Sequence, residues 1–519
     1  MLLRATCLKQ CGLSSLCATA TGFVVDRTLE PMASGRDVVE TVIYRIQRSR
    51  VFPDDRDFLR RVAYTESKFG EEPATYREGY NGGIWQFDRF KTTQFDAQSN
   101  GTTPELRSIH TAIRDTLGIN WMQAKEEDML KPLYSALAAS IYIELTRLTR
   151  GPIPDVIKAQ DMFWKDYYNT NGGKYGDFER RAQELLEKDM RASGGKIDVM
   201  MVVDGSASIG QHAFQTALDS MARLVTLFDL EEANVGMVTY SNTVTSLIPL
   251  VNNFTTARLQ EAIRGTLYPD AGTNTYLGMM AAVDEFKKLP ENRGERGVPR
   301  LLVVLTDGNH LTGPKPGIAA QKAAKAGIIP CAFGIGNDID DSELLEIANN
   351  ISDYKFRTES YYSLQQQIVL IARWVKTLPQ TLKMGFETSE TLKEANEKRH
   401  YRLEVPENGT TIRLVNERGE SRGYWTYADE RPSSALYDGT IYGGETFIPP
   451  PQPAPGNRSD TVKTASMSDL KIAIESFEAN SRLRMWILEG DATESAAVKL
   501  DFACFVHVAV YIFAAVLLK

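Results

Sequence analysis

Five side chains in three separate stretches of the sequence have the residue types and spacing of a cation site. Asp204, Ser206 and Ser208 occupy alternate positions, so a single loop can turn their oxygens the same way. Thr273 in a second stretch adds a hydroxyl, and Asp307 in a third stretch adds a second carboxylate. Carboxylates and hydroxyls without His or Cys make a hard oxygen site, which suits Mg²⁺, Mn²⁺ or Ca²⁺ and not zinc.

The elements around these residues predict how they are brought together. Apolar strand patterns alternate with helical patterns, which predicts a doubly wound α/β fold with a mostly parallel sheet and helices on both faces. Strands are expected at residues 197–203, 233–240, 244–250, 300–305 and 328–335, and helices at 213–228, 256–263, 276–289, 318–326, 342–348 and 362–376. Asp204 and Asp307 each directly follow an expected strand, and such sheets bind ligands at the carboxyl ends of their strands. We therefore expect the two carboxylates to lie side by side.

The pattern Asp204-x-Ser206-x-Ser208 with Thr273 and Thr306-Asp307-Gly308 resembles the von Willebrand factor A domain with a complete metal-ion-dependent adhesion site, over about residues 196–378. Alone, the first string is equally typical of a solvated loop or a helix N-cap. The resemblance implies that the two serines and the threonine contact the metal directly, and that the two aspartates act mostly through water. It also implies that an acidic side chain of a partner completes the metal's coordination.

Two polar groups near this pattern are assigned other roles. His310 closely follows the third stretch, but hard cations prefer oxygen, so we expect a loop-surface histidine. Asp340 or Asp341 is expected to cap the helix at residues 342–348, because the surrounding acidic run lacks the spacing of a calcium loop.

A second set of candidate residues lies in the first part of the chain. Glu66 ends a helical pattern, Gln86 lies in a Gly-x-x-Gln turn, and Asn169 precedes two glycines. This order resembles the lysozyme-like and lytic transglycosylase superfamily, over about residues 36–190. The resemblance implies an α-helical domain in which Glu66 is the general acid of glycan cleavage. Asp88 is the candidate second carboxylate, with Glu78 behind it. Without this resemblance, Glu66 is a solvated carboxylate at a helix end.

The third part of the chain changes to short alternating strands separated by turn residues. This pattern predicts a small β-sandwich over about residues 380–490, similar to the pre-peptidase C-terminal type of module. It contains no visible catalytic motif.

The composition narrows the classes of partner and compartment. With a net charge of −8 over 519 residues, the chain lacks the basic excess of nucleic-acid-binding proteins, so nucleic acid is not expected as a partner. Its five cysteines form no recognisable disulfide framework. Five N-x-Ser/Thr sequons are consistent with secretion, at Asn100, Asn253, Asn350, Asn408 and Asn457.

Both ends of the chain carry apolar segments. Residues 1–20 are interpreted as a weak signal peptide. Residues 502–518 are continuously apolar and follow small residues at 490–492 and a polar spacer at 493–501, the order of a glycosylphosphatidylinositol attachment signal. A short transmembrane helix is the alternative, and a buried helix of a soluble domain is a third reading.

Two functional hypotheses follow from the sequence. The first is a non-enzymatic adhesion or receptor protein, secreted or anchored at the cell surface, whose A domain binds an acidic group of a protein partner through Mg²⁺. The second is a glycan hydrolase of the muramidase or lytic type, with Glu66 as general acid and the A domain as its targeting module.

Overall fold

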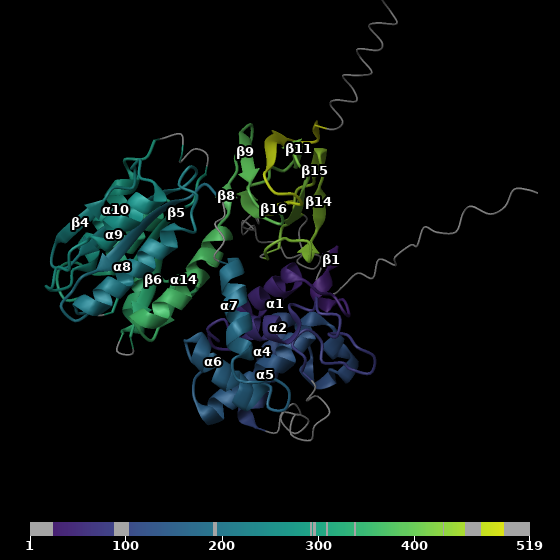
Figure 1. Cartoon of the computed structure of the whole chain (residues 1–519). Helices are drawn as coiled ribbons and strands as arrows, with labels where there is room; N and C mark the ends of the chain where they lie inside the picture. Colours follow the sequence, from purple (N-terminus) through teal and green to yellow (C-terminus); the bar gives the residue numbers. More distant parts are fainter. Residues whose placement is uncertain are drawn as a thin grey trace, which may run out of the picture.

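The computed structural model describes residues 24–87, 103–189, 195–290, 293, 297–307, 310–336, 339–428, 430–451 and 469–492. Three parts follow one another along the chain in Figure 1: a helical part in purple and blue, an α/β part in teal, and a β part in green and yellow. Asp88, the expected signal peptide at residues 1–20 and the apolar tail at residues 502–518 lie outside the described residues.

Amphipathic helices build the first part around one apolar core. On α1, residues Val38, Val39, Val42, Ile43 and Ile46 recur at helical spacing and are all buried. The other helices bury their apolar faces against the same core. The helices are α1 (Arg36–Ser49), α2 (Phe58–Ser67), α4 (Pro104–Leu117), α5 (Pro132–Arg150), α6 (Ile157–Phe163) and α7 (Asp177–Asp189), with a π-helical turn at Trp164–Tyr168. The helical region is therefore present, whereas its lysozyme-like identity stays a prediction.

A six-stranded sheet forms the centre of the second part. Its order is β4-β3-β2-β5-β6-β7, and every neighbouring pair is parallel except β3 with β4. The strands are β2 (Asp198–Asp204), β3 (Asn234–Tyr240), β4 (Val244–Ile248), β5 (Arg300–Thr306), β6 (Ile328–Ile335) and β7 (Lys355–Thr358). The predicted mixed, mostly parallel sheet is confirmed. The short edge strand β7 was not expected from the sequence.

Helices cover both faces of this sheet, because successive side chains of its strands point to opposite sides. On β2, Val199, Met201 and Val203 face one core, whereas Met200 and Val202 face the other. The first core is covered by α8 (Gln211–Val225), α9 (Thr256–Arg264) and α14 (Tyr361–Lys376). The second is covered by α10 (Thr275–Phe286), α12 (Pro316–Lys325) and α13 (Asp341–Ile347).

Two antiparallel-rich sheets form the third part and share one apolar core, which is a β-sandwich as expected. One sheet has the order β14-β12-β16-β10-β8 and the other β15-β11-β17-β9. The strands are β8 (Gln380–Thr381), β9 (Glu387–Leu392), β10 (Lys398–Leu403), β11 (Thr410–Arg418), β12 (Ser421–Thr426), β14 (Gly439–Ile441), β15 (Gly444–Ile448), β16 (Leu470–Ser476) and β17 (Ser481–Glu489).

The helical part and the β part pack against each other although the α/β part separates them in sequence. Strand β1 (Val25–Asp26) pairs antiparallel with β13 (Leu436–Tyr437), and the Arg27 backbone N–H donates to the Ala435 carbonyl at 2.8 Å. Ala435 is fully buried and belongs to the core of the helical part. A residue from late in the chain therefore completes the first folded part.

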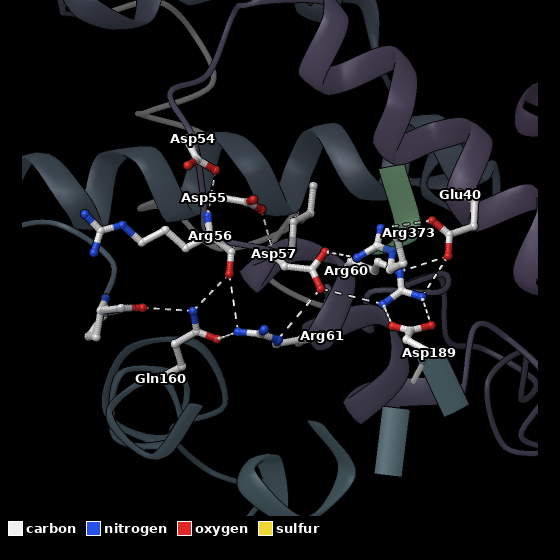
Figure 2. A network of polar contacts seen from close by, with 12 residues as sticks. Glu40, Asp54, Asp55, Arg56, Asp57, Arg60, Arg61, Gln160, Asp189 and Arg373 are labelled. Carbon is white, nitrogen blue, oxygen red and sulfur yellow. Dashed lines mark hydrogen bonds and ion pairs between the residues drawn. The ribbon is translucent and has the colours of Figure 1, made fainter. Parts of the chain in front are cut away.

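A buried ionic cluster joins the helical part to the last helix of the α/β part (Figure 2). Arg60 of α2 is 1% exposed and bonds Asp189 at 2.7 Å and Glu40 at 2.8 Å. Arg373 of α14 reaches Asp57 at 2.7 Å and Glu40 at 3.3 Å. Burial alone would raise the pKa of Glu40, but the charges of Arg60 and Arg373 outweigh it and lower that pKa to about 2.

The helical part also holds the segment that leads into α14. Asp155 is 1% exposed, pairs with Arg56 and accepts a hydrogen bond from the Glu359 backbone N–H at 2.5 Å. Arg56 and Asp57 adopt left-handed backbone conformations, with φ of 55° and 64°, which are unusual for residues other than glycine. Both ends of α14 are thus fixed by contacts with the helical part.

Replacing Arg373 by alanine is expected to lower the free energy of unfolding by about 3 kcal/mol, because the buried Asp57 and the half-buried Glu40 lose a cation whose side chain is 19% exposed. Urea denaturation measures this change. Arg264→Ala is the matched control: its pair with Asp219 at 3.1 Å has both side chains about 45% exposed, so it should change stability by less than about 1 kcal/mol. Equal, small effects of the two variants would contradict the structural importance of the cluster.

Candidate metal centre

The carboxyl ends of two neighbouring strands bring the two predicted aspartates together. Strands β2 and β5 are parallel and in register, with Val203 opposite Leu305. Asp204 ends β2, and Asp307 directly follows β5. Ser208 links the two loops, because its hydroxyl donates to Asp307 Oδ1 at 3.2 Å.

Asp204 is the buried acceptor that organises the site. It is 1% exposed, and its Oδ1 accepts the Ser206 backbone N–H at 2.8 Å. Its Oδ2 accepts the Thr306 hydroxyl at 2.8 Å and the Tyr240 hydroxyl at 3.2 Å. Burial raises the pKa of Asp204, and these hydrogen bonds oppose that rise because they favour the anion. The carboxylate therefore ties its own loop to strands β3 and β5.

The two serines place their hydroxyls next to Asp307. Ser206 Oγ and Ser208 Oγ are 3.1 Å apart, and Asp307 Oδ1 continues this chain of oxygens. Ser206 is buried, whereas Ser208 is exposed. The three oxygens thus lead from the buried floor of the site to the surface.

Thr273 reaches the site on a loop that is bonded to the serine loop. The Ala207 backbone N–H donates to the Ala271 carbonyl at 2.7 Å, and Ser206 forms a β-bridge with Ala271. Gly272 faces Asn242 so closely that an added Cβ would lie 2.2 Å from the Asn242 side-chain oxygen. Thr273 itself is 3% exposed, and within the described part of the chain its hydroxyl has no hydrogen-bond partner. That oxygen remains available for a cation.

The electrostatics of the site favour a bound cation. Burial raises the pKa of Asp307 to about 6, and the nearby negative charge of Asp204 contributes to the rise. The five residues predicted for this site are three hydroxyl residues and two aspartates. The residues present therefore fit a hard divalent cation, whose positive charge would relieve the repulsion between the two carboxylates.

Two tyrosines support the site and were not assigned to it from the sequence. Tyr240 ends β3 opposite Asp204, so the register of two adjacent parallel strands could have indicated it. Tyr268 donates its hydroxyl to the Ser206 carbonyl at 2.8 Å and accepts the Gly210 N–H at 3.1 Å. The sequence gives no periodic signal for Tyr268, because it lies in an irregular loop.

The neighbouring polar groups have other partners. The His310 ring Nε2 is 3.1 Å from the Gly313 carbonyl, and its backbone N–H donates to Glu343 at 2.8 Å. Asp340 is the N-cap of α13 and accepts the Ser342 N–H at 2.8 Å, which is one of the two expected capping arrangements.

Glu66 lies near the end of α2, where two side chains donate to it. Trp164 Nε1 donates to Glu66 Oε1 at 2.7 Å, and Asn169 Nδ2 is 3.2 Å from the same oxygen. Asn169 is in turn oriented by the N–H groups of Gly172 and Gly173, at 2.9 and 3.0 Å. The structure therefore brings Glu66 and Asn169 together.

In the described part of the chain, neither Gln86 nor Glu78 forms a hydrogen bond or ion pair with Glu66. Gln86 forms the turn itself, because its amide donates to the Gly83 carbonyl at 2.7 Å and the Thr75 carbonyl at 3.1 Å. Glu78 is exposed. Asp88 lies outside the described residues, so the separation between the two expected catalytic carboxylates stays untested.

Comparison with known proteins identifies the central part of the chain. Residues 198–369 match the family model of the von Willebrand factor type A domain. This part of the chain is a von Willebrand factor type A domain. The A domain includes all five predicted metal-site residues. Asp204 ends strand β2 of its central sheet, and the other four residues lie in loops.

Related sequences match about a third of this chain. The chain is 29% identical to chicken (Gallus gallus) matrilin-1 over 178 residues, which is 33% of this chain and 35% of matrilin-1. It is 29% identical to the human collagen alpha-1(XXI) chain over 194 residues, which is 35% of this chain and 20% of that protein. The matched region thus spans about a third of matrilin-1 and a fifth of the collagen chain.

Solved structures show a partial likeness. Proximal thread matrix protein 1 from the mussel byssus aligns with a TM-score of 0.33 and 20% identity, covering 39% of this chain and 51% of that protein. A further structure of the same protein, described as having a zinc-occupied MIDAS motif, aligns with a TM-score of 0.31 and 21% identity over 39% of this chain and 52% of that chain.

Replacing Ser208 by alanine is expected to weaken Mg²⁺ binding at least about tenfold, because a hydroxyl is lost from the proposed donor set. The exposed position should leave stability without Mg²⁺ unchanged within about 0.5 kcal/mol. Thermal unfolding over a Mg²⁺ titration measures both effects, since a ligand at a hundred times its Kd adds about 2.7 kcal/mol.

Thr226→Ala is the matched control for this titration. Thr226 is an exposed hydroxyl residue that follows the far end of α8, so its variant should respond to Mg²⁺ like the wild type. A full Mg²⁺ response of Ser208→Ala would contradict the assignment.

Proposed function

We propose that the A domain holds a divalent cation and binds a carboxylate of an extracellular protein partner through it. The observation that carries this proposal is the row of oxygens formed by Ser206, Ser208 and Asp307, which starts at a buried serine and reaches the surface at Ser208. Mg²⁺ fits this oxygen-only donor set, with Mn²⁺ and Ca²⁺ as the alternatives.

The proposed roles follow from burial and hydrogen bonding. Ser206, Ser208 and Thr273 would contact the ion through hydroxyl oxygens. Asp204 positions the serine loop, because its carboxylate is occupied by three donors. Asp307 adds negative charge at the rim. When bound, the cation supplies a positive centre that attracts an external carboxylate, since neutral hydroxyls neutralise little of its charge.

The relatives of the A domain and the exposed sequons support an extracellular setting. The A domain is similar to parts of matrilins and collagen chains. Three sequon asparagines lie in the described residues, and all of them are exposed: Asn253, Asn350 and Asn408. Within the described ranges, no helix combines the length and apolar character that a membrane span requires. A signal peptide at residues 1–20 and a membrane anchor at residues 502–518 remain predictions.

Binding to a partner is expected to require both the cation and Thr273. Wild-type protein should bind an immobilised extracellular-matrix extract in millimolar Mg²⁺, and EDTA should abolish that binding. Thr273→Val should reduce binding at least about tenfold, because it removes one hydroxyl at nearly constant volume. Surface plasmon resonance measures the change, with Thr226→Ala as the matched control. Binding that persists in EDTA would refute the metal mechanism.

Glycan cleavage is the second candidate, although the comparisons add no support for it. The observation that favours it is the contact between Glu66 and Asn169, in which the amide is itself fixed by two backbone N–H groups. A carboxylate that is only solvated at a helix end does not need a hydrogen-bond partner whose orientation is fixed in this way. The substrate class would be a peptidoglycan or chitin-like polymer.

Glu66→Gln tests this candidate at nearly constant side-chain volume. If Glu66 is the general acid, the variant should cleave glycan at least about a hundredfold more slowly. Its free energy of unfolding should stay within about 2 kcal/mol of the wild-type value. Release of soluble fragments from purified peptidoglycan and from chitin measures cleavage. Glu78→Gln is the control, because Glu78 is exposed. Absence of wild-type cleavage, or equal cleavage by Glu66→Gln, would eliminate this candidate.

A further inference from the structure

We propose that the partner of the A domain presents its carboxylate among apolar side chains, and that Leu267 and Leu311 form the apolar part of the binding surface around the metal. This inference rests on the proposed cation-dependent function and specifies the class of partner. It comes from the surface that surrounds the site, separately from the residues that would hold the ion.

The exposure of the two leucines is the first observation. Leu267 is 85% exposed and Leu311 is 70% exposed. They are the two most exposed large apolar side chains in the described part of the molecule, where the others of this kind range from 37% to 64%. A single exposed leucine is ordinary on protein surfaces. The two highest exposed fractions both belong to loops of one proposed binding site. We therefore assign the two leucines a role in binding.

Leu311 is fixed beside Thr273 by its backbone. Its N–H and that of Thr312 both donate to the Thr273 carbonyl, each at 3.1 Å. The Thr312 hydroxyl lies 3.3 Å from the same oxygen. Three donors on one carbonyl hold this segment against the threonine loop, so the Leu311 side chain is kept at the surface next to a proposed metal ligand.

Leu267 lies in a second segment that contacts the serine loop, through the residue that follows it. It immediately precedes Tyr268, whose hydroxyl bonds the Ser206 carbonyl and the Gly210 N–H. The Tyr268 ring also packs against Phe214 of α8, with centroids 5.2 Å apart. These contacts hold the segment that carries Leu267 against the serine loop. The two leucines therefore lie on segments that are bonded to the two loops that supply the hydroxyls.

The charges around the site indicate what the apolar surface selects. Asp270 is an exposed carboxylate three residues before Thr273, and Glu343 accepts the backbone N–H of His310 close to the third loop. These charges repel a partner segment with several acidic residues. A single Asp or Glu flanked by apolar residues would meet the cation and bury the leucines without that repulsion. The A domain therefore recognises an acidic residue that has apolar neighbours.

Selection from a phage-displayed library of random peptides tests the inference on the whole protein. Peptides are bound in Mg²⁺ and eluted with EDTA. We expect the enriched peptides to carry one Asp or Glu with an apolar residue within two positions. The double variant Leu267→Ser/Leu311→Ser should bind these peptides at least about tenfold more weakly, because burial of even one leucine contributes a factor of this size. Its Mg²⁺ titration should match that of the wild type.

The matched control removes apolar surface elsewhere on the same domain. Val244 and Leu247 lie on the edge strand β4 and are 38% and 43% exposed, so Val244→Ser/Leu247→Ser should bind the peptides like the wild type. Enriched peptides whose acidic residue has only polar or charged neighbours, or full binding by the Leu267/Leu311 variant, would overturn the inference alone. Peptides that stay bound in EDTA, or a wild type without a Mg²⁺ response, would instead overturn the proposed function and the inference with it.

Discussion

A buried carboxylate at the end of the central strand is the constraint on which the proposed metal site depends. Burying the Asp204 anion is costly, and the cost is offset only because donors from three places in the chain converge on it. The backbone of the serine loop, the end of β5 and the end of β3 each supply one donor. The hydrogen bonds that stabilise the buried aspartate therefore also fix the ends of β3 and β5 and the serine loop around Asp204.

The rigid sheet positions the loops, and these loops carry the hydroxyls that would bind a cation. Buried apolar strands determine where the loops begin, since their side chains alternate between two cores. The oxygens that would contact a cation then stand on loops that are bonded to each other through Ala271 and Thr273. A site built in this way needs little rearrangement before binding, so less of the interaction free energy is lost to ordering.

The sequence predicted that Asp204, Ser208 and Asp307 come together, because the signals for this grouping are local. The alternate spacing of Asp204, Ser206 and Ser208 and the apolar runs before both aspartates can be read without knowledge of the fold. The tyrosine at the end of β3 required the strand register, and Tyr268 had no signal at all. The ionic cluster could not be predicted from the sequence, for a different reason. Arg373 and Asp57 are 316 positions apart, and charged residues on helices are usually solvated. The same limit applies to Glu66, whose donors lie about a hundred residues away.

The pairing of β1 with β13 has a consequence for synthesis of the chain. A protein emerges from the ribosome from its N-terminus, and its parts begin to fold as they appear. The helices come first, yet the strand partner of Val25 and the buried Ala435 are made only after the whole A domain has been translated. The A domain can therefore complete its sheet while the helical part still exposes the surface that Ala435 will cover. The helical part is thus made before the A domain but completed only after it.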